Sequence, residues 1–280
     1  MMIRLHSLFG PYLIFIKLLF TGLIILGLSR LGLVVWQWDR VVAATSLSTM
    51  FWQGIRADLI MMGMLLAPLA LAMPLLANRM GWQLWQKTVL VWGVLVIVII
   101  SFMEASTPAF ISQYDLRPNR LFVEYLRYPK EVFATLWQGF RWPLVIGLTL
   151  TVISGCVAVK LLQRWLNEHQ QSWPVWKIWL SWPVLVIVLV FMIRSSIGHR
   201  PANPASFALT SDAMVNSLIL NSAWSVYFAI YNMQHESNAA EVYGTLTQEQ
   251  ILAELHENYP WIRNQPQNKF PTLNVRPATV

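Results

Sequence analysis

The sequence has little charge. Only 12% of its 280 residues are Asp, Glu, Lys or Arg, whereas a soluble globular protein carries roughly 25%. Because 56% of the residues are hydrophobic, this composition argues against a soluble enzyme. The net charge is +7, from 20 Lys and Arg against 13 Asp and Glu. On a membrane protein such a surplus is expected beside anionic headgroups, so we predict no nucleic-acid partner.

Residues that bind metals or act as nucleophiles are also scarce. Cys156 is the only cysteine and lies in an apolar run, which excludes a disulfide scaffold and a thiolate zinc site. The five histidines are scattered, with no two close in sequence. The sequence has neither a Gly-rich phosphate loop nor a nucleophile elbow. We therefore expect no catalytic residue, cofactor or metal site within this chain.

Long apolar runs are what the sequence has in abundance. A membrane-spanning helix needs about 20 apolar residues, and only helices satisfy their own backbone at this length in lipid. Tryptophans cluster near the ends of the runs, as in the aromatic belts of membrane proteins. These features predict an all-α integral membrane protein with five transmembrane helices. The predicted spans are residues 11–35, 57–77, 88–105, 143–162 and 173–191.

The chain becomes polar after the fifth run. Within a predicted helical tail at 195–257, apolar residues recur at helical spacing over 212–232, which predicts one amphipathic helix. Thr247 and Gln250 form a capping box that opens a further short helix. Residues 258–280 contain prolines and no periodicity, which predicts a linker. The domain boundaries expected are thus 1–194, 195–257 and 258–280.

The third predicted loop, residues 104–141, contains a charged and periodic segment at residues 115–140. Arg120, Glu124 and Arg127 fall on one helix face, and an apolar stripe follows Pro129. This pattern predicts two short amphipathic helices lying in the membrane interface. Their charged face, with Arg117, either packs as salt bridges on the rim of the bundle or meets lipid phosphates or a docked domain, since guanidinium groups grip phosphate at two oxygens.

Charged residues inside the spans are costly to bury in lipid. Lys17 and Arg30 are expected to extend their charged ends toward opposite membrane faces. Arg56, Asp58 and Glu104 fall near one membrane face if the helices alternate. They either form a structural pair such as Arg56–Glu104 or line a polar pocket for lipid or substrate. The Lys and Arg distribution among the loops leaves the orientation of the chain open.

Four stretches resemble a known family: Arg56-Ala57-Asp58-Leu59 and residues 115–132, 196–204 and 216–222. They are similar to the membrane portion of lipoteichoic acid synthase-like proteins, five-helix inner-membrane proteins of the sulfatase/alkaline-phosphatase superfamily that include phosphoglycerol transferases. The resemblance implies a cytoplasmic N-terminus and a periplasmic tail. It also implies that the linker leads to a sulfatase-like domain, with a Thr nucleophile and a divalent metal, Mn²⁺ or Mg²⁺, which this sequence does not include.

Two function classes follow. In the first, the chain is the membrane anchor and lipid-presenting module of a bacterial phosphoglycerol transferase. Its partners would be anionic phospholipid and a sulfatase-like catalytic domain, in cis or from a neighbouring reading frame. In the second, it is a non-enzymatic lipid-sensing or regulatory inner-membrane protein of the same family. The candidate lipid-headgroup or docking residues are Arg56, Asp58, Glu104, Arg117, Arg120, Glu124 and Arg127.

Overall fold

The structure is a computed structural model that describes residues 9–77, 81–168, 173–234 and 246–258. All regular structure in these ranges is helical. Five helices are long and apolar enough to cross a membrane. They are α2 (Leu13–Trp36, preceded by the 3-10 turn η1, Gly10–Tyr12), α4 (Leu47–Leu76), α5 (Trp82–Tyr114), α8 (Arg141–Glu168) and α9 (Val175–Arg194). The prediction of five spans is confirmed, and the chain has the helices of a multi-pass membrane protein.

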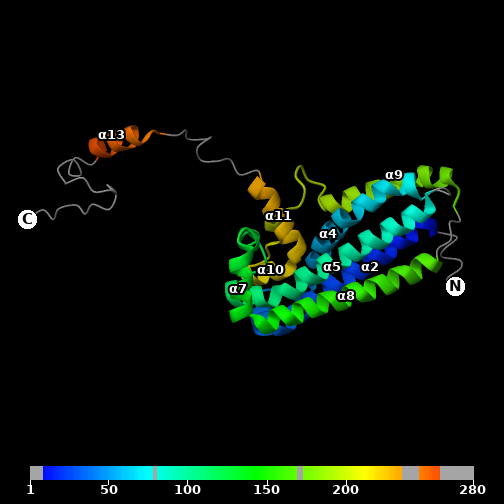
Figure 1. The fold of residues 1–280 in the computed structure, drawn as a ribbon, viewed down its shortest axis with the longest axis horizontal. Helices are drawn as coiled ribbons and strands as arrows, with labels where there is room; N and C mark the ends of the chain where they lie inside the picture. Colours follow the sequence, from blue (N-terminus) through cyan, green and yellow to red (C-terminus); the bar gives the residue numbers. More distant parts are fainter. Residues whose placement is uncertain (1–8, 78–80, 169–172, 235–245, 259–280) are drawn as a thin grey trace, which may run out of the picture. The chain divides into compact units, whose positions relative to one another are not determined.

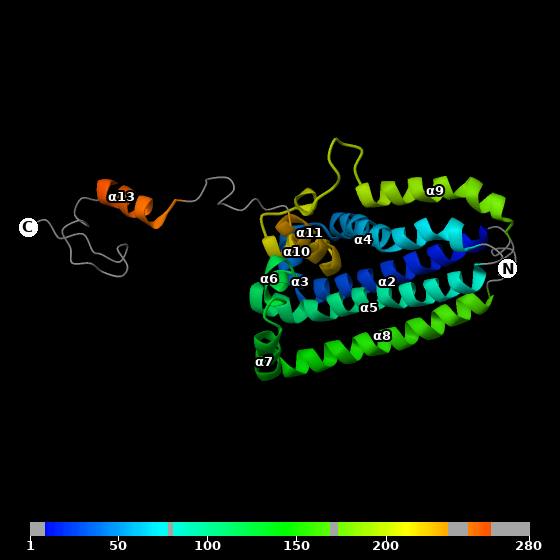
Figure 2. The same cartoon turned by 45° about the horizontal axis from the view of Figure 1, so that its top comes forward.

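The long helices lie side by side (Figures 1 and 2). α5 packs along α8, α4 packs along α9, and α2 contacts both α4 and α5. At 33 residues, α5 is about 50 Å long at 1.5 Å per residue. The hydrocarbon core of a bilayer is about 30 Å thick, so α5 is long enough to reach into the headgroup layer.

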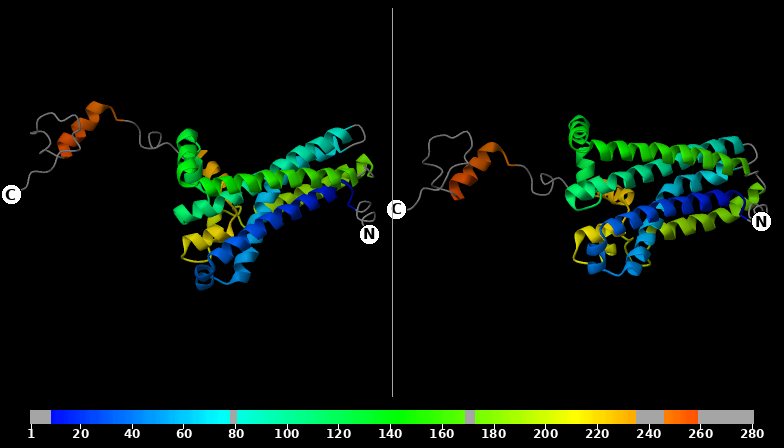
Figure 3. Two further views of the ribbon diagram at one scale, coloured as in Figure 1. Left: turned by 60° about the horizontal axis from the view of Figure 1, so that its bottom comes forward. Right: turned by 90° about the horizontal axis from the view of Figure 1, so that it is seen from below.

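One end of the bundle carries most of the short helices (Figure 3). These are α3 (Trp38–Ala44), α6 (Arg120–Tyr125), α7 (Pro129–Gly139), η2 (Pro204–Phe207), α10 (Ala213–Ile219) and α11 (Ser222–Gln234). We call it the α7 end. The two short helices predicted within 115–140 are confirmed as helices, and their place in a membrane interface stays a prediction. The sequence did not predict α3.

A separate compact unit, Asn232–Val280, contains α13 (Gln248–Asn258). The predicted capping box is confirmed there, because Thr247 N donates to Gln250 Oε1 at 2.9 Å and Gln250 N donates to Thr247 Oγ1 at 3.3 Å. The linker predicted over 258–280 falls, beyond Asn258, outside the described residues.

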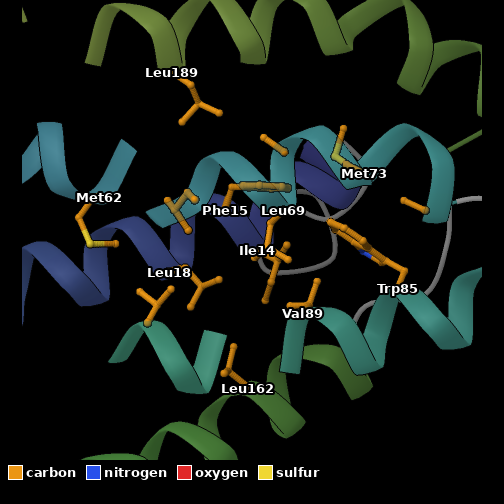
Figure 4. Packing of buried hydrophobic residues seen from close by; sticks show 14 of the residues in the cluster. Ile14, Phe15, Leu18, Met62, Leu69, Met73, Trp85, Val89, Leu162 and Leu189 are labelled. Atoms are coloured by element: carbon orange, nitrogen blue, oxygen red, sulfur yellow. The ribbon is translucent and has the colours of Figure 1, made fainter. Parts of the chain in front are cut away.

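The core of the bundle has two parts. The first draws on all five long helices, as Figure 4 shows for Phe15, Met62, Trp85, Leu162 and Leu189. The second lies at the α7 end, where the apolar side of α10 packs against α2 and α4. Large side chains on α8 and α9 are exposed instead, as expected of helix faces that meet lipid.

The single amphipathic helix predicted over 212–232 is wrong. The segment forms α10 and α11, which meet at an angle of 106°. The apolar spacing continues across the break, so periodicity alone does not reveal it. Leu220 is extended, with ψ 174, and the next two residues are held by side chains of the bundle.

Candidate functional site

Two buried ion pairs form the centre of the site. Arg30 of α2 is fully buried and donates from both terminal nitrogens to Asp58 of α4, with Nη1–Oδ2 and Nη2–Oδ1 distances of 2.7 Å. Its Nε donates to the carbonyl of Leu218 at 3.3 Å. This is a fork-to-carboxylate pair, the geometry in which guanidinium binds most strongly.

The second pair joins Glu104 of α5 to Arg117. Arg117 Nη1 lies 2.9 and 2.8 Å from the two carboxylate oxygens, and both side chains are buried. The hydroxyl of Ser29, next to Arg30 on α2, also donates to Glu104. Nε of Arg117 is the one buried side-chain donor without a partner in the described part of the chain.

Both pairs hold the break between α10 and α11. Asn221 Nδ2 donates to Asp58 Oδ1 at 3.1 Å and to the carbonyl of Ala57 at 3.1 Å. The backbone N–H of Ser222 donates to Glu104 Oε1 at 2.9 Å. Neighbouring residues at the break are therefore bound by carboxylates from two different long helices.

The charges at the break match the exposed backbone groups of the two helix ends. The last carbonyls of a helix carry partial negative charge and its first N–H groups partial positive charge. Arg30 contacts a carbonyl in the last turn of α10, and Glu104 accepts from the N–H of Ser222 at the start of α11. Asn221 Oδ1 also accepts from Trp224 N at 2.9 Å, as an N-cap side chain does. The network thus satisfies backbone groups that a broken helix would leave unpaired in an apolar surrounding.

The network is suited to holding structure rather than to reacting. Its two guanidinium groups and two carboxylates balance in charge, and each carboxylate accepts from several donors. Across residues 9–77, 81–168, 173–234 and 246–258, no group of three or more His, Cys, Asp or Glu could hold a metal ion.

A third, exposed charge cluster lies at the α7 end. Asp115 ends α5 in the left-handed conformation (φ 54), which turns the chain so that Arg117 can reach back to Glu104. Arg40 of α3 donates to both oxygens of Asp115 at 2.6 and 2.8 Å and also binds Asp212. Hydrogen bonds to Asp115, and then to Asp212, raise the pKa of Arg40. The hydrogen bond from Arg40 is the main cause that lowers the pKa of Asp212, which also caps α10 through Met214 N and Val215 N.

Arg56 does not pair with Glu104, so the pair suggested by the sequence is wrong. Arg56 donates to Gln53 Oε1 at 2.6 Å and to the carbonyl of Ser195 at 2.7 Å. Its guanidinium also lies 5.3 Å from the ring centre of Phe207. Arg56 therefore fixes the end of α9 and the segment that follows it, while Arg117 takes the place beside Glu104.

Other expectations for the charged residues also need correction. Arg30 does not extend toward a membrane face, because Asp58 compensates its charge within the bundle. Lys17 lies 5.4 Å from the ring centre of Trp165, and its extension toward a membrane face stays a prediction. Arg117 is not on an exposed face with Arg120 and Arg127, since only 2% of its side chain is exposed.

The remaining candidates lie apart from the buried network. Arg120 Nε donates to Glu124 Oε1 at 2.7 Å on α6, and both side chains are partly exposed. Arg127 follows the end of α6 and is exposed. The sequence reasoning missed Arg40, Ser29 and the roles of Asn221 and Ser222. Asn and Ser inside an otherwise apolar helical pattern were the available signal for the last two.

No family model matches the chain. No solved structure matches it significantly.

Proposed function

We propose that this chain is the membrane module of a sulfatase-superfamily phosphoglycerol transferase of the bacterial envelope. It would anchor the enzyme in the inner membrane, with the N-terminus in the cytoplasm and the α7 end facing the periplasm. It would present anionic phospholipid to a sulfatase-like catalytic domain, in cis or from a neighbouring reading frame. That domain, not this chain, would hold the divalent metal.

One observation carries the proposal: three of the four stretches that resemble the family meet in the buried network. Asp58 comes from the first, Arg117 from the second, and Asn221 and Ser222 from the last. The remaining stretch begins at Ser196, directly after the carbonyl that Arg56 binds. Three of the four stretches therefore contribute residues to the network that holds α10 and α11 against the long helices.

This construction suits a module that serves a domain outside the membrane. The segment after the fifth span is attached to α2, α4 and α5 by hydrogen bonds to the charged side chains of the buried ion pairs rather than left as a free tether. A domain that follows or docks on it would be held close to the membrane face where its lipid donor lies.

The test is loss and restoration of phosphoglycerol transfer in the source bacterium. We expect deletion of the gene to abolish transfer of labelled glycerol phosphate from phosphatidylglycerol to envelope acceptors, and the intact chain to restore it. Asp58→Leu should fail to restore it, whereas Asp39→Asn, at an exposed site on α3, should succeed. Transfer that is unchanged on deletion would overturn the proposal. Together with altered lipid composition, that result would favour the non-enzymatic regulatory function.

A further inference from the structure

A cavity of about 540 Å³ lies between α5, α6, α7 and the start of α8, apart from the buried network. Its walls are mainly apolar and include Phe102, Phe110, Phe122, Val132, Leu136 and Leu148. Its volume falls within the range of about 300–1,000 Å³ that is usual for small-molecule sites. Its lining residues Leu126 and Leu148 are 59% and 46% exposed, so the cavity is open to the surroundings.

The cavity follows the long axis of α5. Lining residues run from Phe102 to Tyr114, a length of about 18 Å at 1.5 Å per residue. The apolar layer of one leaflet is about 15 Å deep, half of a 30 Å core. The cavity therefore has the length of one leaflet and lies along the end of a helix that crosses it.

Polar groups gather where α5 ends and α6 passes to α7. The hydroxyls of Tyr114 and Tyr125 lie 2.8 Å apart, and Gln113 and Glu131 also line the cavity.

Exposed cations adjoin this polar end. Arg127 stands between the lining residues Leu126 and Tyr128, and Lys130 precedes the lining residue Glu131. In the described part of the chain, no carboxylate forms an ion pair with Arg127 or Lys130. The polar end therefore has a surplus of positive charge.

The ligand that matches these features is an amphiphile with an anionic head. An open apolar cavity as deep as a leaflet suits a hydrocarbon chain, and unpaired cations at its polar end suit a phosphate. We propose that the cavity binds an acyl chain of an anionic membrane phospholipid whose phosphate lies at Arg127 and Lys130. The inference rests on the proposed function only for its purpose, the presentation of lipid, because the binding is measured on the chain alone.

The test uses the full chain in phosphatidylcholine vesicles that contain phosphatidylglycerol with a photoactivatable diazirine on its acyl chain. We expect adducts on residues 102–114 and 132–136, located by mass spectrometry. Val132→Trp, which fills the cavity, should lower this labelling several-fold. Phe133→Trp is the matched control, because Phe133 is the next residue on α7, is 58% exposed and does not line the cavity. Leu136→Trp serves as a second blocking variant if Val132→Trp does not fold.

Replacing both Arg127 and Lys130 with Gln should remove the preference for phosphatidylglycerol over a phosphatidylcholine probe of the same chain. Lys177→Gln, an exposed cation at the start of α9, should not. Labelling that is unchanged in folded Val132→Trp, or spread evenly over the exposed faces of α8 and α9, would overturn the lipid site. Equal labelling of the intact chain by both probes would overturn its assignment to an anionic lipid. Loss of labelling in Val132→Trp with normal phosphoglycerol transfer would leave the site standing and count against its proposed purpose.

Discussion

Individual residues explain why charges can lie inside this bundle. An unpaired charge in the apolar layer is costly, and breaking a buried pair by removing one partner costs about 3–5 kcal/mol. Arg30 and Asp58 avoid this cost because they share two hydrogen bonds, and the carbonyl of Leu218 and the side-chain amide of Asn221 supply further ones. The space for the guanidinium comes from Gly54, one turn before Asp58 on α4. A methyl group there would lie 2.5 Å from Arg30 Cζ.

Gly54→Ala should therefore destabilise the protein by about 1–3 kcal/mol, the usual cost of overpacking. The guanidinium cannot move aside without losing its bonds to Asp58. The measurement is the midpoint of thermal unfolding in detergent. Gly27→Ala on α2 is the control, because nothing lies within 4 Å of the added methyl, and Ala favours helix over Gly. Equal midpoints for the two variants would show that α4 and α2 are not closely packed at Gly54.

The ion pair itself can be tested by a double-mutant cycle. Asp58→Leu should cost several kcal/mol, because it leaves Arg30 charged and buried without its partner. Adding Arg30→Met should restore part of that loss, since two apolar side chains can replace a buried pair at lower cost than one unpaired charge. Unfolding free energies of the four proteins give the coupling energy. Additive losses would mean that Arg30 and Asp58 do not act as a pair.

At the scale of elements, the sequence predicted the long helices better than their connections. The five apolar runs were enough to predict the five long helices, because length and hydropathy suffice for that inference. The break between α10 and α11 was missed because the apolar spacing of Val215, Ile219 and Tyr227 continues through it. Bonds to Asp58 and Glu104, which lie far away in the chain, decide the conformation there. The predicted Arg56–Glu104 pair was wrong for a related reason. The spacing of residues along a helix does not show how that helix is rotated against its neighbour, so it does not show which charged side chains meet.

The exposed cluster that joins α3, α5 and α10 should make stability depend on pH. The pKa of Asp212 is lower in the folded protein, chiefly because Arg40 binds it. Its contribution is therefore present above the unfolded value of about 3.9 and is lost as the pH falls through the folded value. Asp212→Asn, which can still cap α10, should lose about 0.2–1 kcal/mol near neutral pH, the range for exposed pairs.

Thermal melting of both proteins from neutral to acidic pH measures this difference. It should shrink toward zero in acid, where Asp212 of the wild type is protonated. Asp39→Asn is the control, because Asp39 is an exposed carboxylate next to Arg40 in sequence. A constant difference across the range would mean that the charge of Asp212 does not contribute.

At the scale of the whole molecule, the odd number of spans has a direct consequence. If each of the five long helices crosses the membrane once, the chain before α2 and the residues that follow α9 lie on opposite sides of it. The α7 end, where α2 and α5 end and where the buried network and the cavity lie, is then on the side of the residues that follow α9. The proposed function needs this side to be the periplasm, where lipid donor and catalytic domain would meet.

A reporter enzyme that works only in the cytoplasm decides the orientation. Fused after Val280 it should be silent, whereas fused after Ala77, which follows α4 at the opposite end of the bundle, it should be active. The Lys and Arg count could not decide this, because much of the positive charge at the α7 end is used within the protein: Arg40, Arg117 and Arg120 all bind carboxylates. Charges neutralised in this way give little information on which side of the membrane a loop lies.

The reverse pattern of reporter activity would place Arg127 and Lys130 at the cytoplasmic leaflet. It would remove the basis for lipid presentation to a periplasmic domain while leaving the cavity and its ligand open to the labelling experiment.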